Sequence, residues 1–232
     1  MKYKLPIILL ISILTFISCS NSDNIITQRH PKKCLILGNS ITLHGTCSYW
    51  WGRWGMAAST KENDFVHKLE NKIKTHYKNF SCTPVNIANW ETSLNIDSIN
   101  FTNLNISDYD YIVIRLGENI SNNIETMACE KAIKELITSI KERNGSTKLY
   151  ITGVFWPNTS KETAIKNVAT SENIIYINID KIYSDVNIQK VGNQVFGDDG
   201  QLHIINHDGV AAHPNDSGME AIAEEIYKAM FP

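Results

Sequence analysis

Ser40, Asn119 and His213 are the residues whose types and positions best suit chemistry in this sequence of 232 residues. Ser40 follows the apolar run Cys34–Leu37 and the dipeptide Gly38-Asn39, while His213 precedes a segment that is predicted to be helical. A serine hydroxyl is a weak nucleophile until a base removes its proton, and histidine is the usual base. An asparagine amide can stabilise the negative charge that develops on an attacked carbonyl. The combination indicates nucleophilic attack on an acyl group.

These residues follow predicted strands that are continuous apolar runs, as in sheets buried on both faces. We expect strands at 34–38, 83–89, 109–117, 148–155 and 174–179, and helices at 61–80, 124–140, 159–173 and 215–231. The alternation predicts an α/β fold, a three-layer α/β/α sandwich with a parallel, flavodoxin-like central sheet of about five strands. Ligands bind beyond the carboxyl ends of such strands, where Ser40, Asn89-Trp90-Glu91 and Glu118-Asn119 would meet. The stretch 180–213 is predicted to be irregular, and Asn215 or Asp216 to cap the final helix.

Three segments resemble the sequence blocks of the SGNH (GDSL-type) hydrolases, in family order over residues 34–230. ILGNSITLHG resembles the first block, with Asn39 where the family has Asp, and VIRLGENISNN resembles the third. DGVAAHPNDSGMEAIA resembles the last block, in which His-Pro precedes the final helix. The resemblance implies an esterase that needs no cofactor or metal. It makes Ser40 the nucleophile and His213 the base, and it places the Ser40 N–H and the Asn119 amide in the oxyanion hole.

Two segments depart from the family pattern. The second block, VNIANWETS, lacks the glycine whose N–H joins the oxyanion hole, and we expect the N–H of Trp90 to replace it. The family acid stands three residues before the histidine, but Val210 occupies that position here, and the nearest upstream acid is Asp208. Either a longer loop brings Asp208 to the imidazole, or a backbone carbonyl orients His213 and the enzyme uses a dyad.

Trp50, Trp51 and Trp54 lie within fifteen residues of Ser40. They could form an aromatic wall that binds a sugar ring or an acyl group, or a hydrophobic plug that covers the edge of the sheet. Three observations together suggest the substrate: the possible aromatic wall, the family resemblance and the predicted export of the protein. We expect a small ester or an acetylated glycan, in which the acetyl groups are carried on carbohydrate.

The N-terminus has the pattern of a bacterial lipoprotein. Two lysines, a short apolar run and Ile17-Ser18-Cys19 predict a signal peptide at 1–19 with lipidation at Cys19, followed by a polar tether at 20–31 and the hydrolase domain at 32–232. An ordinary cleaved signal is the alternative. We expect a membrane-anchored protein of the cell envelope, at the outer membrane on its periplasmic or surface side. We expect no nucleic-acid partner, because the net charge of the chain is −2.

Two other functions remain open from the sequence. His203, His207, Asp208 and His213 lie close together in the chain and could be ligands of a metal-dependent hydrolase, although no HExxH motif is present. The altered second block and the displaced acid are also compatible with a non-catalytic glycan-binding lipoprotein that keeps the fold. The GxSxG, P-loop and GxGxxG motifs are absent from the sequence.

Overall fold

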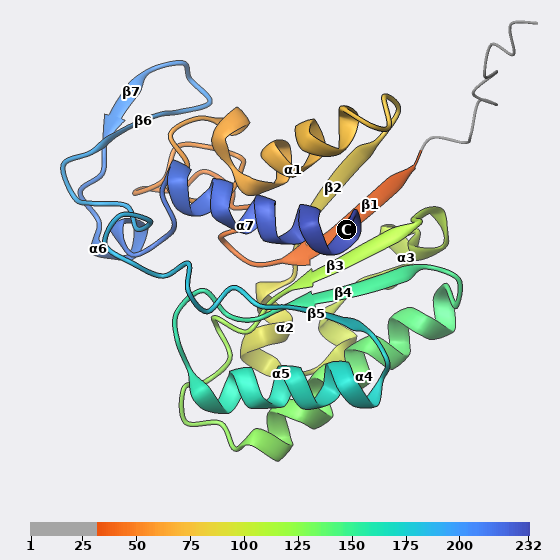
Figure 1. Cartoon of the computed structure of the whole chain (residues 1–232). Helices are drawn as coiled ribbons and strands as arrows, with labels where there is room; N and C mark the ends of the chain where they lie inside the picture. The colour runs from red at the N-terminus through yellow and green to blue at the C-terminus, as the bar shows by residue number, and fades with distance from the viewer. Residues whose placement is uncertain (1–31) are drawn as a thin grey trace, which may run out of the picture. The chain divides into compact units, whose positions relative to one another are not determined.

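The computed structural model describes residues 32–232, so the predicted signal peptide, Cys19 and the tether lie outside the described residues. Five strands form one sheet in the order β2-β1-β3-β4-β5, and every neighbouring pair is parallel (Figure 1). They are β1 (Lys33–Gly38), β2 (Ser81–Asn86), β3 (Tyr111–Arg115), β4 (Lys148–Thr152) and β5 (Ile175–Ile177). The predicted parallel, flavodoxin-like sheet of five strands is confirmed.

Helices cover both faces of the sheet, because successive side chains of each buried strand point to opposite sides. Cys34 and Ile36 of β1 pack in the core beneath α1 (Phe65–Lys74) and α7 (Asp216–Met230). Leu35 and Leu37 pack in a second core on the other face. That face is covered by α2 (Ala88–Ser93), α3 (Phe101–Leu104), α4 (Thr126–Arg143) and α5 (Thr159–Ser171). The predicted three layers are therefore present.

Side-chain caps mark where three of the long helices, α1, α5 and α7, begin. Asp64 accepts a hydrogen bond from the N–H of His67 at the start of α1, and Asn158 caps α5 in the same way. The final helix, α7, is capped by Asn215, whose Oδ1 accepts from two backbone N–H groups at 3.0 Å each. Asp216 binds Ser59 instead, so only the first of the two predicted caps is used. The caps satisfy N–H groups that have no partner within the helix.

The irregular stretch predicted at 180–213 contains regular elements. β6 (Gln194–Phe196) and β7 (Leu202–Ile204) form an antiparallel hairpin, and α6 (Asp208–Ala211) is a short helix before His213. Three single-turn 3-10 helices, η1 (Lys61–Asn63), η2 (Ile96–Ser98) and η3 (Ile106–Asp108), connect other elements. Across residues 32–232, no helix has the length and apolar character required to span a bilayer.

Candidate active site

Ser40 lies in a tight turn at the carboxyl end of β1. The carbonyl oxygen of Asn39 accepts a hydrogen bond from the N–H of Thr42 at 2.9 Å, and Asn39 Oδ1 accepts from the N–H of Ile41 at 3.1 Å. The turn requires glycine at position 38, because a Cβ there would lie 1.9 Å from Thr42 Oγ1. Ser40 thereby lines an open cleft of about 340 Å³ beyond the edge of the sheet.

The hydroxyl of Ser40 contacts the imidazole of His213, although the two residues are 173 positions apart in the sequence. Ser40 Oγ lies 2.7 Å from His213 Nε2, and His213 Nδ1 lies 2.6 Å from the carbonyl oxygen of Gly209. A carbonyl oxygen can only accept a hydrogen bond, so Nδ1 carries the proton and Nε2 has a free lone pair. This tautomer is the one that can remove a proton from the serine.

The segment that carries His213 is held from two sides. The backbone N–H of Gln189 donates to the carbonyl oxygen of His213 at 2.8 Å. Trp156, which follows β4, donates from Nε1 to the carbonyl oxygen of Ala212 at 2.9 Å, and its ring meets the imidazole edge-on at 5.2 Å between centroids. These contacts keep the imidazole in place without a carboxylate.

Burial makes His213 a weak base that is uncharged at neutral pH. Desolvation lowers the pKa of His213 to about 4, and the charges of His44 and Arg115 act in the same direction. The hydrogen bond to Gly209 and the charge of Glu118 oppose this shift only in part. A base must be unprotonated to act, and His213 meets that condition at neutral pH.

Asp208 does not reach the imidazole. It is exposed at the start of α6, while the carbonyl oxygen of Gly209 occupies the position next to Nδ1 of His213. The α6 turn brings that carbonyl to the ring, because the backbone N–H of His213 also bonds within the turn, to the carbonyl oxygen of Val210. The sequence left two alternatives open. The geometry matches the one in which a backbone carbonyl orients His213, and it does not match the one in which Asp208 does.

Asn119 lines the same cleft and lies in the loop that follows β3. Its Nδ2 donates to Glu91 Oε2 at 2.7 Å, and because an amide nitrogen carries two hydrogens, one N–H is left for a ligand. Gly117 has a φ of 127°, a conformation that residues with a Cβ rarely adopt, and it lets the loop turn back over the sheet. The structure therefore brings together Ser40, Asn119 and His213.

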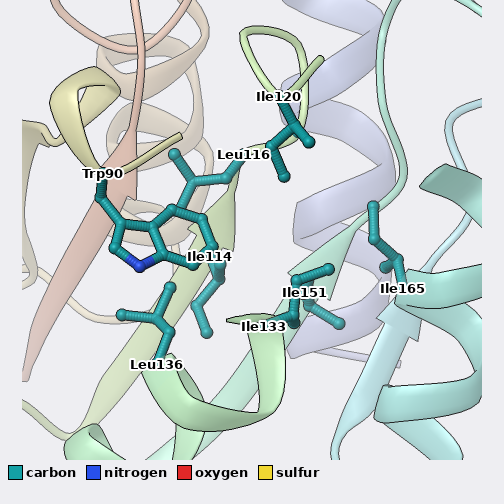
Figure 2. A pocket seen from close by; sticks show the side chains of 9 residues that line it. Trp90, Ile114, Leu116, Ile120, Ile133, Leu136, Ile151 and Ile165 are labelled. Atoms are coloured by element: carbon teal, nitrogen blue, oxygen red, sulfur yellow. The ribbon is translucent and has the colours of Figure 1, made fainter. Parts of the chain in front are cut away.

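Trp90 does not border the cleft, contrary to the sequence-based expectation. Its backbone N–H donates to the carbonyl oxygen of Ile87 at 2.9 Å, and its side chain is only 1% exposed. Figure 2 shows the indole among apolar side chains of β3 and α4, including Ile114 and Leu136. The reason is that the chain becomes helical directly after Ile87, so Asn89 faces the cleft and Trp90 faces the core. The three-residue spacing of Ile87 and Trp90 is the signal that could have indicated this helix.

The segment that carries Trp50, Trp51 and Trp54 does not form the expected binding wall. Trp50 and Trp54 are buried and pack edge-to-face, so the expectation that they bind substrate is wrong. Trp51 is half-buried and stacks on His203, with ring centroids 4.4 Å apart. Tyr49, and none of these tryptophans, lines the cleft, and the sequence reasoning missed it.

Tyr49 and His207 form one side of the cleft, with their rings stacked at 4.3 Å between centroids. His203 bonds to Asp199 at 3.0 Å, and His213 bonds to Ser40. The three histidines of the metal-dependent alternative therefore each contact a different residue. Among residues 32–232, no group of three His, Cys, Asp or Glu side chains is placed to hold a metal ion.

No family model matches this sequence, and the search of curated proteins gave no match. Solved structures do resemble the fold at low sequence identity. One is a two-domain esterase active on acetylated mannans, co-crystallised with mannopentaose, with a TM-score of 0.55, 16% identity, and coverage of 86% of this chain and 49% of that one.

A carbohydrate esterase family 2 enzyme with a carbohydrate-binding domain, from Corynascus thermopiles, has a TM-score of 0.52 and 15% identity, with 86% of this chain and 65% of that chain covered. A GDSL-like lipase candidate from Bacteroides ovatus has a TM-score of 0.54 and 13% identity, with 87% and 99% covered. The chain thus spans about half to two thirds of the two carbohydrate esterases and nearly all of the lipase candidate. It has the flavodoxin-like fold of the SGNH hydrolases.

Proposed function

We propose that this chain is a serine esterase that hydrolyses short acyl esters through an acyl-enzyme on Ser40. The observation that carries the proposal is the hydrogen-bonded series from Ser40 Oγ through His213 to the carbonyl oxygen of Gly209, with contacts of 2.7 and 2.6 Å. It joins a nucleophile to a base in the required tautomer. The backbone carbonyl stands where a triad has its acid, so the catalytic pair is a dyad.

The reaction follows from this geometry. His213 Nε2 removes the Ser40 proton as Oγ attacks the ester carbonyl, and the resulting oxyanion accepts hydrogen bonds from the Asn119 amide and the Ser40 N–H. The imidazolium then donates its proton to the leaving alcohol. A water molecule, deprotonated by the same Nε2, attacks the acyl-enzyme and releases the acid and the free serine.

The lining of the cleft supports a short acyl group and a polar leaving group. Only Tyr49, Met56 and Ala88 of the lining residues have largely apolar side chains, so a long acyl chain would find little apolar surface. Tyr49 and His207 line the cleft together with Ser40, and we propose that their rings provide an apolar surface against which a sugar ring can pack. We therefore propose acetyl groups on carbohydrate as substrate, which accords with the resemblance to an esterase active on acetylated mannans.

The cellular location is also part of the proposal. The pattern around Cys19 favours lipidation and anchoring in the cell envelope, on the periplasmic or surface side of the outer membrane. Metabolic labelling with a palmitate analogue tests it. We expect label in the full chain and none after Cys19→Ala, and label in both would refute the assignment.

The experiment for the esterase compares the purified chain with Ser40→Ala on p-nitrophenyl acetate, butyrate and palmitate. Ser171→Ala is the matched control, because Ser171 lies at the end of α5 with its hydroxyl bonded to the carbonyl oxygen of Val168. We expect hydrolysis that favours acetate, a loss of at least about 10³-fold in Ser40→Ala, and wild-type activity in the control.

Two results would refute the esterase. One is full activity in Ser40→Ala. The other is a folded wild-type protein that hydrolyses none of these esters and no acetylated xylan or mannan, while still binding such a glycan. The second result would establish the non-catalytic glycan-binding alternative.

A further inference from the structure

Glu91 is a buried carboxylate beneath the cleft that the proposed reaction does not use. It lies in α2 and is 1% exposed. Its Oε1 accepts from the backbone N–H of Gly117 at 2.5 Å, from Asn39 Nδ2 at 3.1 Å and from the N–H of Asn119 at 3.4 Å. Its Oε2 accepts from the side-chain amide of Asn119 at 2.7 Å. All four partners are donors, as an ionised carboxylate requires.

The contact with Asn119 decides which way the amide faces. The oxygen and nitrogen of an asparagine amide have nearly the same size, so packing alone does not distinguish the two orientations. A carboxylate does, because it accepts from an NH₂ group and repels a carbonyl oxygen. With one N–H held by Glu91, the amide group is planar and directs its second N–H away from Glu91. A reversed amide would offer the carbonyl oxygen of Asn119 to an oxyanion.

Hydrogen bonds favour the ionised form of Glu91 although the side chain is buried. Asn39 Nδ2 donates to both Glu91 and Glu118, with 2.6 Å to the Oε2 of Glu118, and so separates the two carboxylates. Arg115 Nη1 lies 2.7 Å from Glu118 Oε2 and balances that second charge. Burial and the charge of Glu118 still raise the pKa of Glu91, whereas the bonds from Gly117, Asn119 and Asn39 lower it.

We infer that Glu91 is the positioning residue of the oxyanion hole, holding the Asn119 amide with its N–H toward the cleft and joining the loops after β1 and β3. The inference rests on the proposed function and adds a residue to it. It also accounts for Asn39 at a position where the SGNH pattern has Asp. An aspartate at position 39 would place a third carboxylate between Glu91 and Glu118. It would have no N–H group to donate to either of them.

The test is Glu91→Gln, which keeps the shape of the side chain but offers an NH₂ group to one of its donors. With the Gln oxygen toward the N–H of Gly117, the new NH₂ faces Asn119, and the Asn119 amide must reverse. We expect kcat to fall about 10²-fold with little change in KM, the loss expected for one oxyanion donor. Glu162→Gln is the matched control, since Glu162 also accepts from a backbone N–H, that of Val154 at 2.8 Å, outside the cleft.

A double-mutant cycle separates positioning from general loss of structure. If Glu91 acts through Asn119, Glu91→Gln costs less than about threefold more in a background that already carries Asn119→Ala. Independent, multiplicative losses in the double variant would overturn the inference. So would a wild-type kcat in Glu91→Gln, or a loss of the same size in the Glu162→Gln control.

A second measurement needs no activity, so failure of the proposed function and failure of the inference remain distinguishable. In the NMR spectrum of the full chain, Asn119→Ala identifies the side-chain NH₂ resonances of Asn119. We expect Glu91→Gln to shift these two resonances and to speed their hydrogen exchange, with no such effect in Glu162→Gln. If the wild type hydrolyses no ester, the esterase is refuted while this spectrum still decides the role of Glu91. Unchanged Asn119 resonances would overturn that role.

Discussion

Lowering the pH should reveal the buried state of His213 in the proposed esterase activity. Burial lowers the pKa of His213 to about 4, from an ordinary value of 6.5. At pH 5, a histidine with the ordinary pKa would be only about 3% unprotonated, whereas a pKa of about 4 leaves about 90% in the active form. The structure therefore predicts about thirtyfold more activity at pH 5 than an exposed histidine would support.

The assay is kcat/KM from pH 3.5 to 8, because this parameter reports ionisation of the free enzyme. Acetate release is measured by chromatography, so that the ionisation of a chromogenic leaving group does not disturb the profile. We expect a plateau above pH 5 and half the plateau value near pH 4. A midpoint at pH 6.5 or above would show that His213 is solvated, or that a carboxylate pairs with it, and would refute the dyad geometry.

The same shift predicts a loss of stability in acid. The unfolded chain binds a proton at His213 with the ordinary pKa of 6.5, but the folded chain binds it only near pH 4. Acidification therefore favours the unfolded state, and the contribution grows as the pH falls from 6.5 to about 4, where it reaches about 3 kcal/mol. Urea unfolding of the wild type and of His213→Gln at pH 7 and pH 4 measures it. Equal pH dependence in the two proteins would contradict the prediction.

Four further substitutions have expected outcomes. Asp208→Asn should change kcat/KM by less than about twofold, where loss of a triad acid costs about 10⁴-fold, and a large loss would restore the triad. Asn39→Asp should lower the free energy of unfolding by about 3 kcal/mol at pH 7 in urea, because it buries an unpaired charge; no change would contradict the network. Tyr49→Ala should raise KM for an acetylated oligosaccharide three- to tenfold, on the scale of about 1 kcal/mol for a ring contact, and leave p-nitrophenyl acetate unaffected. Gly117→Ala should lower the free energy of unfolding by about 2 kcal/mol, because the φ of Gly117 is 127° and a Cβ would lie 2.5 Å from Val154 Cγ1. An unchanged melting temperature would refute this prediction.

The sequence was sufficient for the sheet and for two of the three candidate site residues that line the cleft. Continuous apolar runs specify buried parallel strands, and the ends of such strands must meet at one edge, which brings Ser40 near Asn119. His213 stood out among the histidines by its position before the final helix, but its assignment as the base of Ser40 rested on the resemblance. No local pattern places a loop histidine beside a serine 173 residues away. Its place is fixed by long-range contacts, such as that of Trp156 with Ala212.

Apolar patterns were insufficient where the direction of a side chain mattered. Trp90 and Trp50 differ little from cleft-lining aromatics in type or in distance along the chain, yet both point into the core. The hairpin at 194–204 was missed because its strands are short, and one of its backbone bonds runs to Ser59, far away in the sequence. The position of Glu91 after the second predicted strand placed it near the site, but its role did not follow from the sequence. That role depends on donors from three residues in other segments, Asn39, Gly117 and Asn119.

The carbonyl oxygen that orients His213 belongs to the peptide backbone, and every residue type supplies one. No side-chain substitution can delete it, so substitutions at position 208 leave the proposed dyad unchanged as long as the α6 turn forms. In the proposed esterase, selection for catalysis acts on the shape of that turn and not on the identity of an acid. A search for an acidic residue three positions before the histidine would consequently pass over enzymes built in this way.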